Sequence, residues 1–107
     1  MELFIKDRLY FSQLLPAQNT FMEFNLKKSI IEKVGLTDED KKKFEIKEDK
    51  EAGKIVWNIE KDMKNPLVVD FTKEEIEYLR KGCEALTNAP FPDDFWVTVE
   101  KVYNALA

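Results

Sequence analysis

The stretch that decides the fold is Pro66–Leu86, which reads PLVVDFTKEEIEYLRKGCEAL. In its first part, a strand over Leu67–Phe71 would place Leu67, Val69 and Phe71 on one face and Val68 and Asp70 on the other. Its second part opens at Thr72, where a threonine is followed three residues later by a glutamate, the signature of a capping box. The stretch therefore predicts a strand that runs directly into a helix.

The helix predicted after Thr72 has a single apolar face. The residues of this face recur every three or four positions, and they are Ile76, Leu79, Cys83 and Leu86. We expect this face to pack against the strand residues Leu67, Val69 and Phe71, with Trp57 beside them. Because a reactive thiolate needs exposure and nearby positive charge, we interpret Cys83 as a core residue and not as a nucleophile.

Upstream of this stretch, two further segments alternate between apolar and polar residues, Phe44–Lys47 and Ile55–Ile59. A charged connection that contains Gly53 separates them, which is typical of a β-hairpin. With Leu67–Phe71 as a third strand, the pattern predicts a three-stranded antiparallel meander. We expect Glu60–Asn65 to be a polar loop within it.

Two helices are predicted before the meander. The first covers Leu3–Leu15, with a few extended residues allowed before it, and ends at Pro16. The second begins at the capping box of Thr20 and ends at Gly35, where we expect a left-handed glycine. Its apolar stripe consists of Met22, Leu26, Ile30 and Val34. A short helical turn is expected to follow at Thr37, with acids in its first turn.

The C-terminal segment begins with Pro92, Asp93 and Asp94, residues that suit the start of a helix. A strand over Phe95–Val99 is the alternative, but length and capping favour a helix. The expected helical face consists of Phe95, Val99, Val102 and Leu106. The fold class predicted is α+β: two N-terminal helices, a three-stranded antiparallel meander, and two C-terminal helices packed on one face of the sheet.

Length and charge narrow the class of protein. A chain of 107 residues matches a single compact domain covering residues 1–107. Its 21 acidic and 17 basic residues give a net charge of −4, which disfavours nucleic-acid binding because that depends on clustered positive charge. The sequence suggests neither a signal peptide nor a membrane-spanning segment. With a single cysteine, these features predict a soluble cytoplasmic protein.

No combination of residues suggests catalysis or a cofactor. The chain has no histidine, and its three glycines form no phosphate-binding pattern. The acid pairs Asp38/Asp40 and Asp93/Asp94 are explained as helix starts, so we expect no metal site. We therefore predict no catalytic, cofactor-binding or metal-binding residues and no small-molecule ligand, and we expect the protein not to be an enzyme. An unrecognised carboxylate, lysine or tyrosine site remains the alternative.

Four large aromatic residues near the C-terminus are the candidate contact residues: Phe91, Phe95, Trp96 and Tyr103. They exceed what one narrow core-facing stripe requires, so they either complete the core or contact a partner. We interpret the chain as a non-enzymatic protein-interaction module that binds a protein partner or self-associates through this region. A weak nucleic-acid contact through Lys27, Lys28 and Lys33 together with Lys41–Lys43 is a further alternative.

Several stretches resemble one group of proteins. These are Arg8-Leu9 with Leu14-Leu15-Pro16, then Lys33–Asp40, then Lys54–Trp57, with Glu100-Lys101 near the C-terminus. Together they resemble a family of short uncharacterised proteins encoded in tailed-phage and prophage genomes. The chain departs from that pattern at Pro92 and in its C-terminal aromatics. The resemblance implies a phage-derived cytoplasmic protein and brings no catalytic residue with it.

Overall fold

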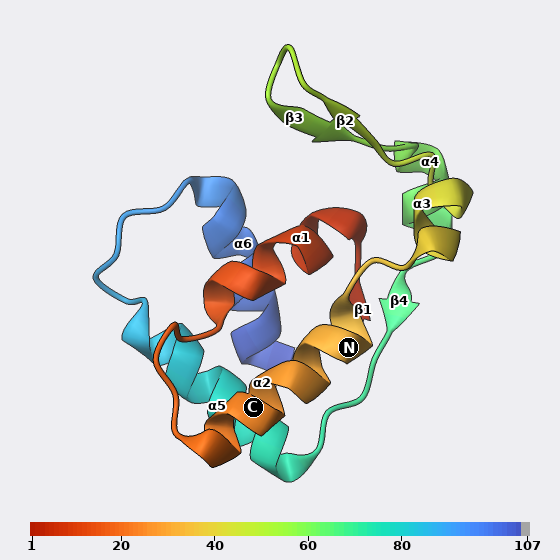
Figure 1. The fold of residues 1–107 in the computed structure, drawn as a ribbon. Helices are drawn as coiled ribbons and strands as arrows, with labels where there is room; N and C mark the ends of the chain where they lie inside the picture. The colour runs from red at the N-terminus through yellow and green to blue at the C-terminus, as the bar shows by residue number, and fades with distance from the viewer. Residues whose placement is uncertain (106–107) are drawn as a thin grey trace.

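The computed structural model describes residues 1–105, which form a body of four long helices and a projecting arm (Figure 1). The four long helices are α1 (Ile5–Leu14), α2 (Phe21–Val34), α5 (Lys73–Ala85) and α6 (Asp93–Ala105). Helix α1 contacts each of the other three. The core is consequently built between helices, and its buried side chains include Leu3, Phe11, Ile30, Leu79, Phe95 and Val102.

The strands form two separate two-stranded antiparallel sheets, so the α+β class is confirmed but the three-stranded meander is wrong. Strand β2 (Lys47–Asp49) pairs only with β3 (Lys54–Val56). Strand β4 (Leu67–Val68) pairs instead with β1 (Glu2–Leu3) at the chain's N-terminus. The expected packing of the C-terminal helices on a sheet is also wrong, because α5 and α6 pack against each other and against α1.

The expected strand Ile55–Ile59 stops early because Asn58 begins a helix. The Asn58 side-chain oxygen accepts a hydrogen bond from the Lys61 amide at 3.0 Å, which caps α4 (Ile59–Lys64). The segment Glu60–Asn65, predicted as a loop, is therefore largely helical. Ile59 is exposed on α4 and does not share a buried strand face with Trp57.

The expected strand Phe44–Lys47 is shortened for a different reason. Phe44 is buried and ends the short helix α3 (Asp38–Lys43). The next residue, Glu45, has a φ of 53°, in the left-handed region that a side chain disfavours. Strand pairing begins only at Lys47.

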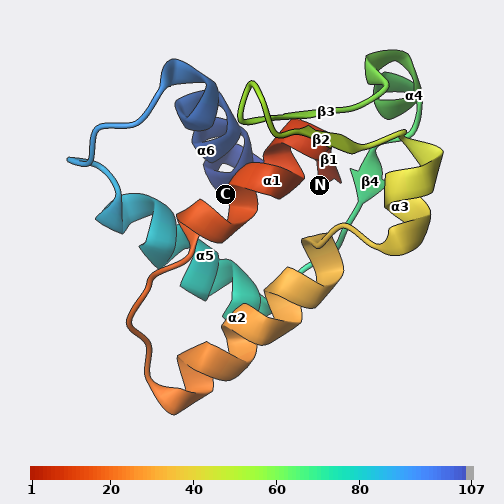
Figure 2. The ribbon, with the colours of Figure 1, turned by 45° about the horizontal axis from the view of Figure 1, so that its top comes forward.

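The hairpin, α3 and α4 together form the arm, which projects from the helical body in Figure 1. In the turned view of Figure 2 the hairpin overlaps α1, and α3 and α4 lie to the right of the body. Trp57 lies at its base, where the indole nitrogen donates to Asp62 Oδ2 at 3.2 Å. The other oxygen of Asp62 accepts from the Ile5 amide at 3.0 Å. Trp57 thus anchors the arm to the start of α1 and is only half-buried, so its predicted place in the main core is wrong.

Other local predictions are confirmed. Thr20, Thr37 and Thr72 each accept a hydrogen bond from the amide three residues later. The inner face after Pro66 packs on the core through Leu67, Val69 and Phe71, and α5 does so through Ile76, Leu79, Cys83 and Leu86. The C-terminal segment is helical over Asp93–Ala105, so the strand alternative is wrong, and Leu106 lies outside the described residues.

Two details of α2 differ from the prediction. Gly35 has a φ of −62° and is extended, so the left-handed ending is wrong. Met22, placed in the buried stripe by its spacing, is 78% exposed, whereas Ile30 and Val34 of the same stripe are buried. The first turn of α2 extends beyond the helices that cover the rest of its inner face.

No helix within residues 1–105 has the length and apolar character needed to span a bilayer.

Gly82 is the point of closest approach between α5 and α1. A β-carbon at this position would lie 2.7 Å from the carbonyl oxygen of Leu14. A glycine-to-alanine change inside a helix ordinarily gains about 1 kcal/mol. We expect Gly82→Ala to lose about 1–3 kcal/mol instead, because the two helices must separate. Urea denaturation of both proteins tests this, and a stabilised variant would contradict the close approach.

Candidate functional site

A groove of about 500 Å³ lies between α5 and α6. We call it the α5–α6 groove. It is lined by Cys83 and Glu84 from α5, by Thr87 just after that helix, and by Trp96, Val99, Glu100, Tyr103 and Asn104 from α6. The lining residues of α6 recur at three- and four-residue intervals, so one face of that helix forms a continuous wall.

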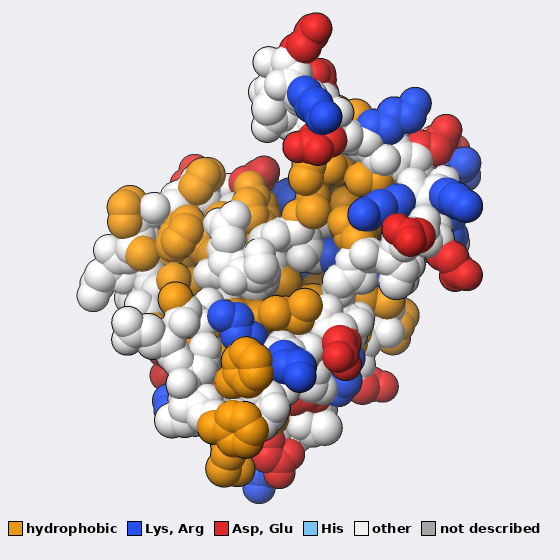
Figure 3. Space-filling view, in the orientation of Figure 1, with side chains coloured by type: hydrophobic (Ala, Val, Ile, Leu, Met, Phe, Trp, Pro, Cys, Tyr) orange, Lys and Arg blue, Asp and Glu red, His pale blue; other side chains and the backbone are white. Residues whose placement is uncertain are grey.

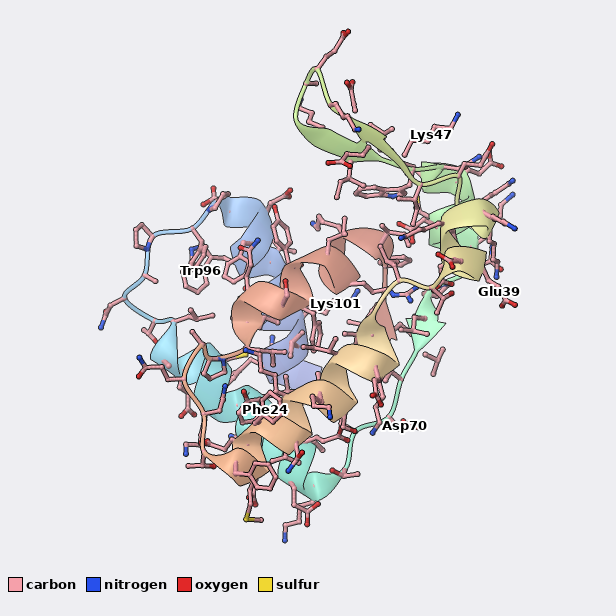
Figure 4. The ribbon with its side chains drawn as sticks, viewed as in Figure 1. Phe24, Glu39, Lys47, Asp70, Trp96 and Lys101 are labelled. Carbon is pink, nitrogen blue, oxygen red and sulfur yellow. The ribbon has the colours of Figure 1, made fainter. Side chains whose placement is uncertain are left out.

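The four aromatic residues predicted as contacts are brought together, but in different roles. Phe95 is fully buried, and its ring centroid lies 4.2 Å from that of Phe91 and 5.6 Å from that of Trp96. Trp96 projects near the start of α6 (Figure 4) and lines the groove. Phe95 and Phe91 therefore support the wall from behind, while Trp96 and Tyr103 face the groove.

Tyr103 is held at the edge of the groove by two contacts. Its hydroxyl donates to Glu84 Oε1 at 3.0 Å, which links α6 to α5. The guanidinium of Arg80 lies over its ring at 5.6 Å, a cation–π distance. A fixed ring loses little conformational freedom when a ligand packs on it.

The edge of the groove is acidic. Glu84 and Glu100 line it from opposite helices, and Glu100 forms no ion pair with any residue in the range 1–105. A ligand that fills the groove would therefore meet apolar rings inside and two carboxylates outside, with the Arg80 guanidinium over the Tyr103 ring. This combination suits an apolar group flanked by positive charge.

Cys83 lies at the bottom of the groove and is 5% exposed. Burial, with a smaller effect of the Glu84 carboxylate, raises the pKa of the thiol to about 11. The thiol is therefore protonated at neutral pH, and thiols rather than thiolates are poor nucleophiles. In the groove Cys83 acts as a small apolar surface.

The carboxylates whose pKa is shifted serve mainly as structural links. Burial alone would raise the pKa of Asp7, Asp40 and Glu75, but their hydrogen bonds and ion pairs outweigh burial and lower it. Each joins two parts of the chain, as Glu75 does through Lys33 Nζ at 2.5 Å. None of these three lines the α5–α6 groove, and residues 1–105 hold no cluster of three or more metal-ligating side chains.

Two other apolar surfaces are exposed. The first, which we call the α2 knob, consists of Phe21, Met22 and Phe24 at the start of α2. The second is a hollow of about 200 Å³ on the arm, lined by Ile55, Val56, Trp57 and Ile59. Spacing placed Met22 in the buried stripe of α2, and Ile55, Trp57 and Ile59 on one strand face, so it did not indicate either surface. Phe21 and Phe24 lie outside that stripe, which is the signal that could have indicated the knob.

The lysines considered for a nucleic-acid contact do not all face outward. Lys33 pairs with Glu75 and also donates to the Asp70 carbonyl at 3.2 Å. Lys27 donates to the Pro16 carbonyl at 2.9 Å. Lys28 lies over the Phe24 ring at 5.7 Å. Two of the three lysines on α2 are thus engaged with other parts of the chain.

Comparison with known proteins finds no match to a protein-family model, to a curated protein or to a solved structure.

Proposed function

We propose that this chain is a non-enzymatic protein-interaction module that binds an apolar, lysine- or arginine-flanked protein segment in the α5–α6 groove. The observation that carries the proposal is the groove itself, with Trp96 and Tyr103 facing it and glutamates at its edge. Its volume of about 500 Å³ lies within the range typical of ligand sites. Rigid aromatic residues supply most of the binding energy at many protein interfaces.

The alternative is an enzyme site formed by Glu84, Glu100 and Tyr103 in the same groove. Glu84 already accepts the Tyr103 hydroxyl, and Tyr103 is in turn stacked by Arg80. These contacts support a fixed binding wall better than a proton-transfer pair. The groove therefore suits binding better than catalysis.

The resemblance to short tailed-phage and prophage proteins suggests where such a module would act. We propose an accessory protein of phage type, acting in the cytoplasm of the host cell. This part of the proposal rests on the shared sequence stretches alone.

A labelled model peptide tests the groove. The probe is an amphipathic helical peptide of leucine and lysine, and its counterpart has glutamate in place of lysine. We expect fluorescence anisotropy to show at least about tenfold tighter binding of the lysine peptide. The glutamates of the second peptide would be repelled by the glutamates at the groove edge. Equal binding of both peptides would contradict the proposal.

Two variants locate that binding. The groove variant combines Glu100→Lys with Tyr103→Ala, which reverses the charge and removes one aromatic wall. The control is Glu32→Lys, an exposed site on α2 with the same change of charge as Glu100→Lys. We expect the groove variant to lose about tenfold or more in affinity for the lysine peptide while the control binds as the parent protein does. Equal losses in both would place binding outside the groove.

A further inference from the structure

The α2 knob exposes three large apolar side chains to solvent. Phe21 is 79% exposed, Met22 is 78% exposed and Phe24 is 48% exposed. Figure 3 shows hydrophobic side chains gathered at the lower end of the molecule, where α2 begins in Figure 1, and Phe24 is labelled there in Figure 4. Contiguous exposed apolar residues of this kind mark contact surfaces.

The knob is held in one conformation by the capping box that precedes it. Thr20 Oγ1 accepts from the Glu23 amide at 3.2 Å, and Glu23 Oε1 accepts from the Thr20 amide at 2.9 Å. Glu23 is fixed further by Lys81 of α5, at 3.8 Å. A segment that is already ordered loses less entropy when it binds.

The positive charge beside the knob is that of Lys28. Its ammonium lies over the Phe24 ring and forms no ion pair with any residue in the range 1–105. Lys27 donates to the Pro16 carbonyl instead, and Lys81 pairs with Glu23. The knob is therefore an apolar tip with one cation, Lys28, beside it.

We propose that a second copy of this chain inserts its α2 knob into the α5–α6 groove, which deepens the proposed function and rests on it. The apolar tip matches the Trp96 and Tyr103 walls, and Lys28 beside the tip matches the acidic edge formed by Glu84 and Glu100. None of the three knob residues lines the groove of its own chain, so the contact joins two copies. Each copy presents both surfaces, so two copies can make the contact twice in a symmetric pair, or each copy can make it with a different neighbour in a longer assembly.

Light scattering across about 10 µM to 1 mM protein measures the assembly. We expect the mass of the parent protein to rise with concentration and that of the knob variant, Phe21→Asp with Met22→Glu, to remain that of a monomer. The knob variant should fold, because both positions are exposed and acids in the first turn stabilise a helix. Glu32→Lys should assemble as the parent does. A parent protein that stays monomeric, or a knob variant that assembles normally, would overturn the inference.

Mixing two variants tests the pairing of the two surfaces. The knob variant retains its groove, and the groove variant retains its knob, so neither should assemble alone. Together they should form a 1:1 complex through the one remaining contact, and failure to do so would overturn the inference. If the lysine peptide binds the groove while the parent stays monomeric, the proposed function stands and only this inference fails. If the peptide also fails to bind, both fail.

Discussion

Replacing Arg8 by alanine is expected to lower the free energy of unfolding by about 3–5 kcal/mol. The buried guanidinium donates from Nε to the Val34 carbonyl at 2.8 Å and from one terminal nitrogen to the Gly35 carbonyl at 2.7 Å. The same terminal nitrogen pairs with Asp40 at 2.8 Å. One side chain thus ends α2, holds the start of α3 and ties both to α1. Alanine would leave two carbonyl oxygens and a carboxylate without these donors.

Urea denaturation at neutral pH measures the loss, with an unchanged m-value as the check that unfolding remains two-state. The control is Lys6→Ala on the same helix, where an exposed pair with Asp94 at 3.4 Å should contribute less than about 1 kcal/mol. Arg8→Lys keeps the charge but cannot form the forked contacts, so its loss should lie between the two. Equal losses in Arg8→Ala and Lys6→Ala would contradict the role assigned to Arg8.

Arg8 connects two of the stretches on which the proposed phage-type origin rests. Arg8-Leu9 and Lys33–Asp40 meet in the structure, because Arg8 binds Val34, Gly35 and Asp40. These residues end one helix and position the next. They therefore carry information about the fold and none about an activity.

Helices α2, α3 and α5 could be predicted because their signals are local. Thr20, Thr37 and Thr72 each stand three residues before an acid, and the capping bonds form as the spacing indicates. The alternation over Leu67–Phe71 correctly separated buried Val69 from exposed Val68. The start of a helix and the buried face of a helix or strand are specified by residues that are close together in the sequence.

The strand partners could not be predicted because they depend on distant residues. Strand β4 pairs with Glu2–Leu3 at the N-terminus of the chain. A strand of two residues is too short to show a periodic pattern in the sequence. Asn58 ends the extended segment after Val56 by capping α4. Asparagine is as common in turns as at helix caps, so the sequence alone did not indicate this helix. The α5–α6 groove could be predicted only in part. The sequence singles out its aromatic residues, but Glu84 and Thr87 lie near them only because α5 packs on α6.

Asp7→Asn is expected to destabilise the protein at neutral pH by about 2–4 kcal/mol. The buried Asp7 carboxylate accepts from Thr98 Oγ1 at 2.7 Å, from Lys101 Nζ at 2.8 Å (Figure 4) and from the Phe4 amide at 3.0 Å. These donors tie α6 to the start of α1. An asparagine amide offers one acceptor oxygen in place of two and carries no charge to pair with Lys101.

The same variant predicts a change in the response to acid. Burial would raise the pKa of Asp7, but the bonds from Lys101, Phe4 and Thr98 outweigh it and lower the pKa below that of the unfolded chain. The stability gained from a lowered pKa is fully present above the unfolded value of about 3.9 and is lost as the pH falls through the folded value. The stability gap between the parent and Asp7→Asn should therefore be constant above about pH 5 and should narrow in stronger acid.

Urea denaturation at a series of pH values from neutral to strongly acid measures that gap. Asp40 and Glu75, whose pKa values are also lowered, are present in both proteins, so their own acid response cancels in the comparison. Lys101→Met should reproduce part of the effect, since it removes the charged partner and leaves Thr98 and the Phe4 amide bound to Asp7. If the curves for the parent and Asp7→Asn stay parallel down to low pH, the carboxylate is not the titrating link between α1 and α6, and the loss at neutral pH would reflect packing alone.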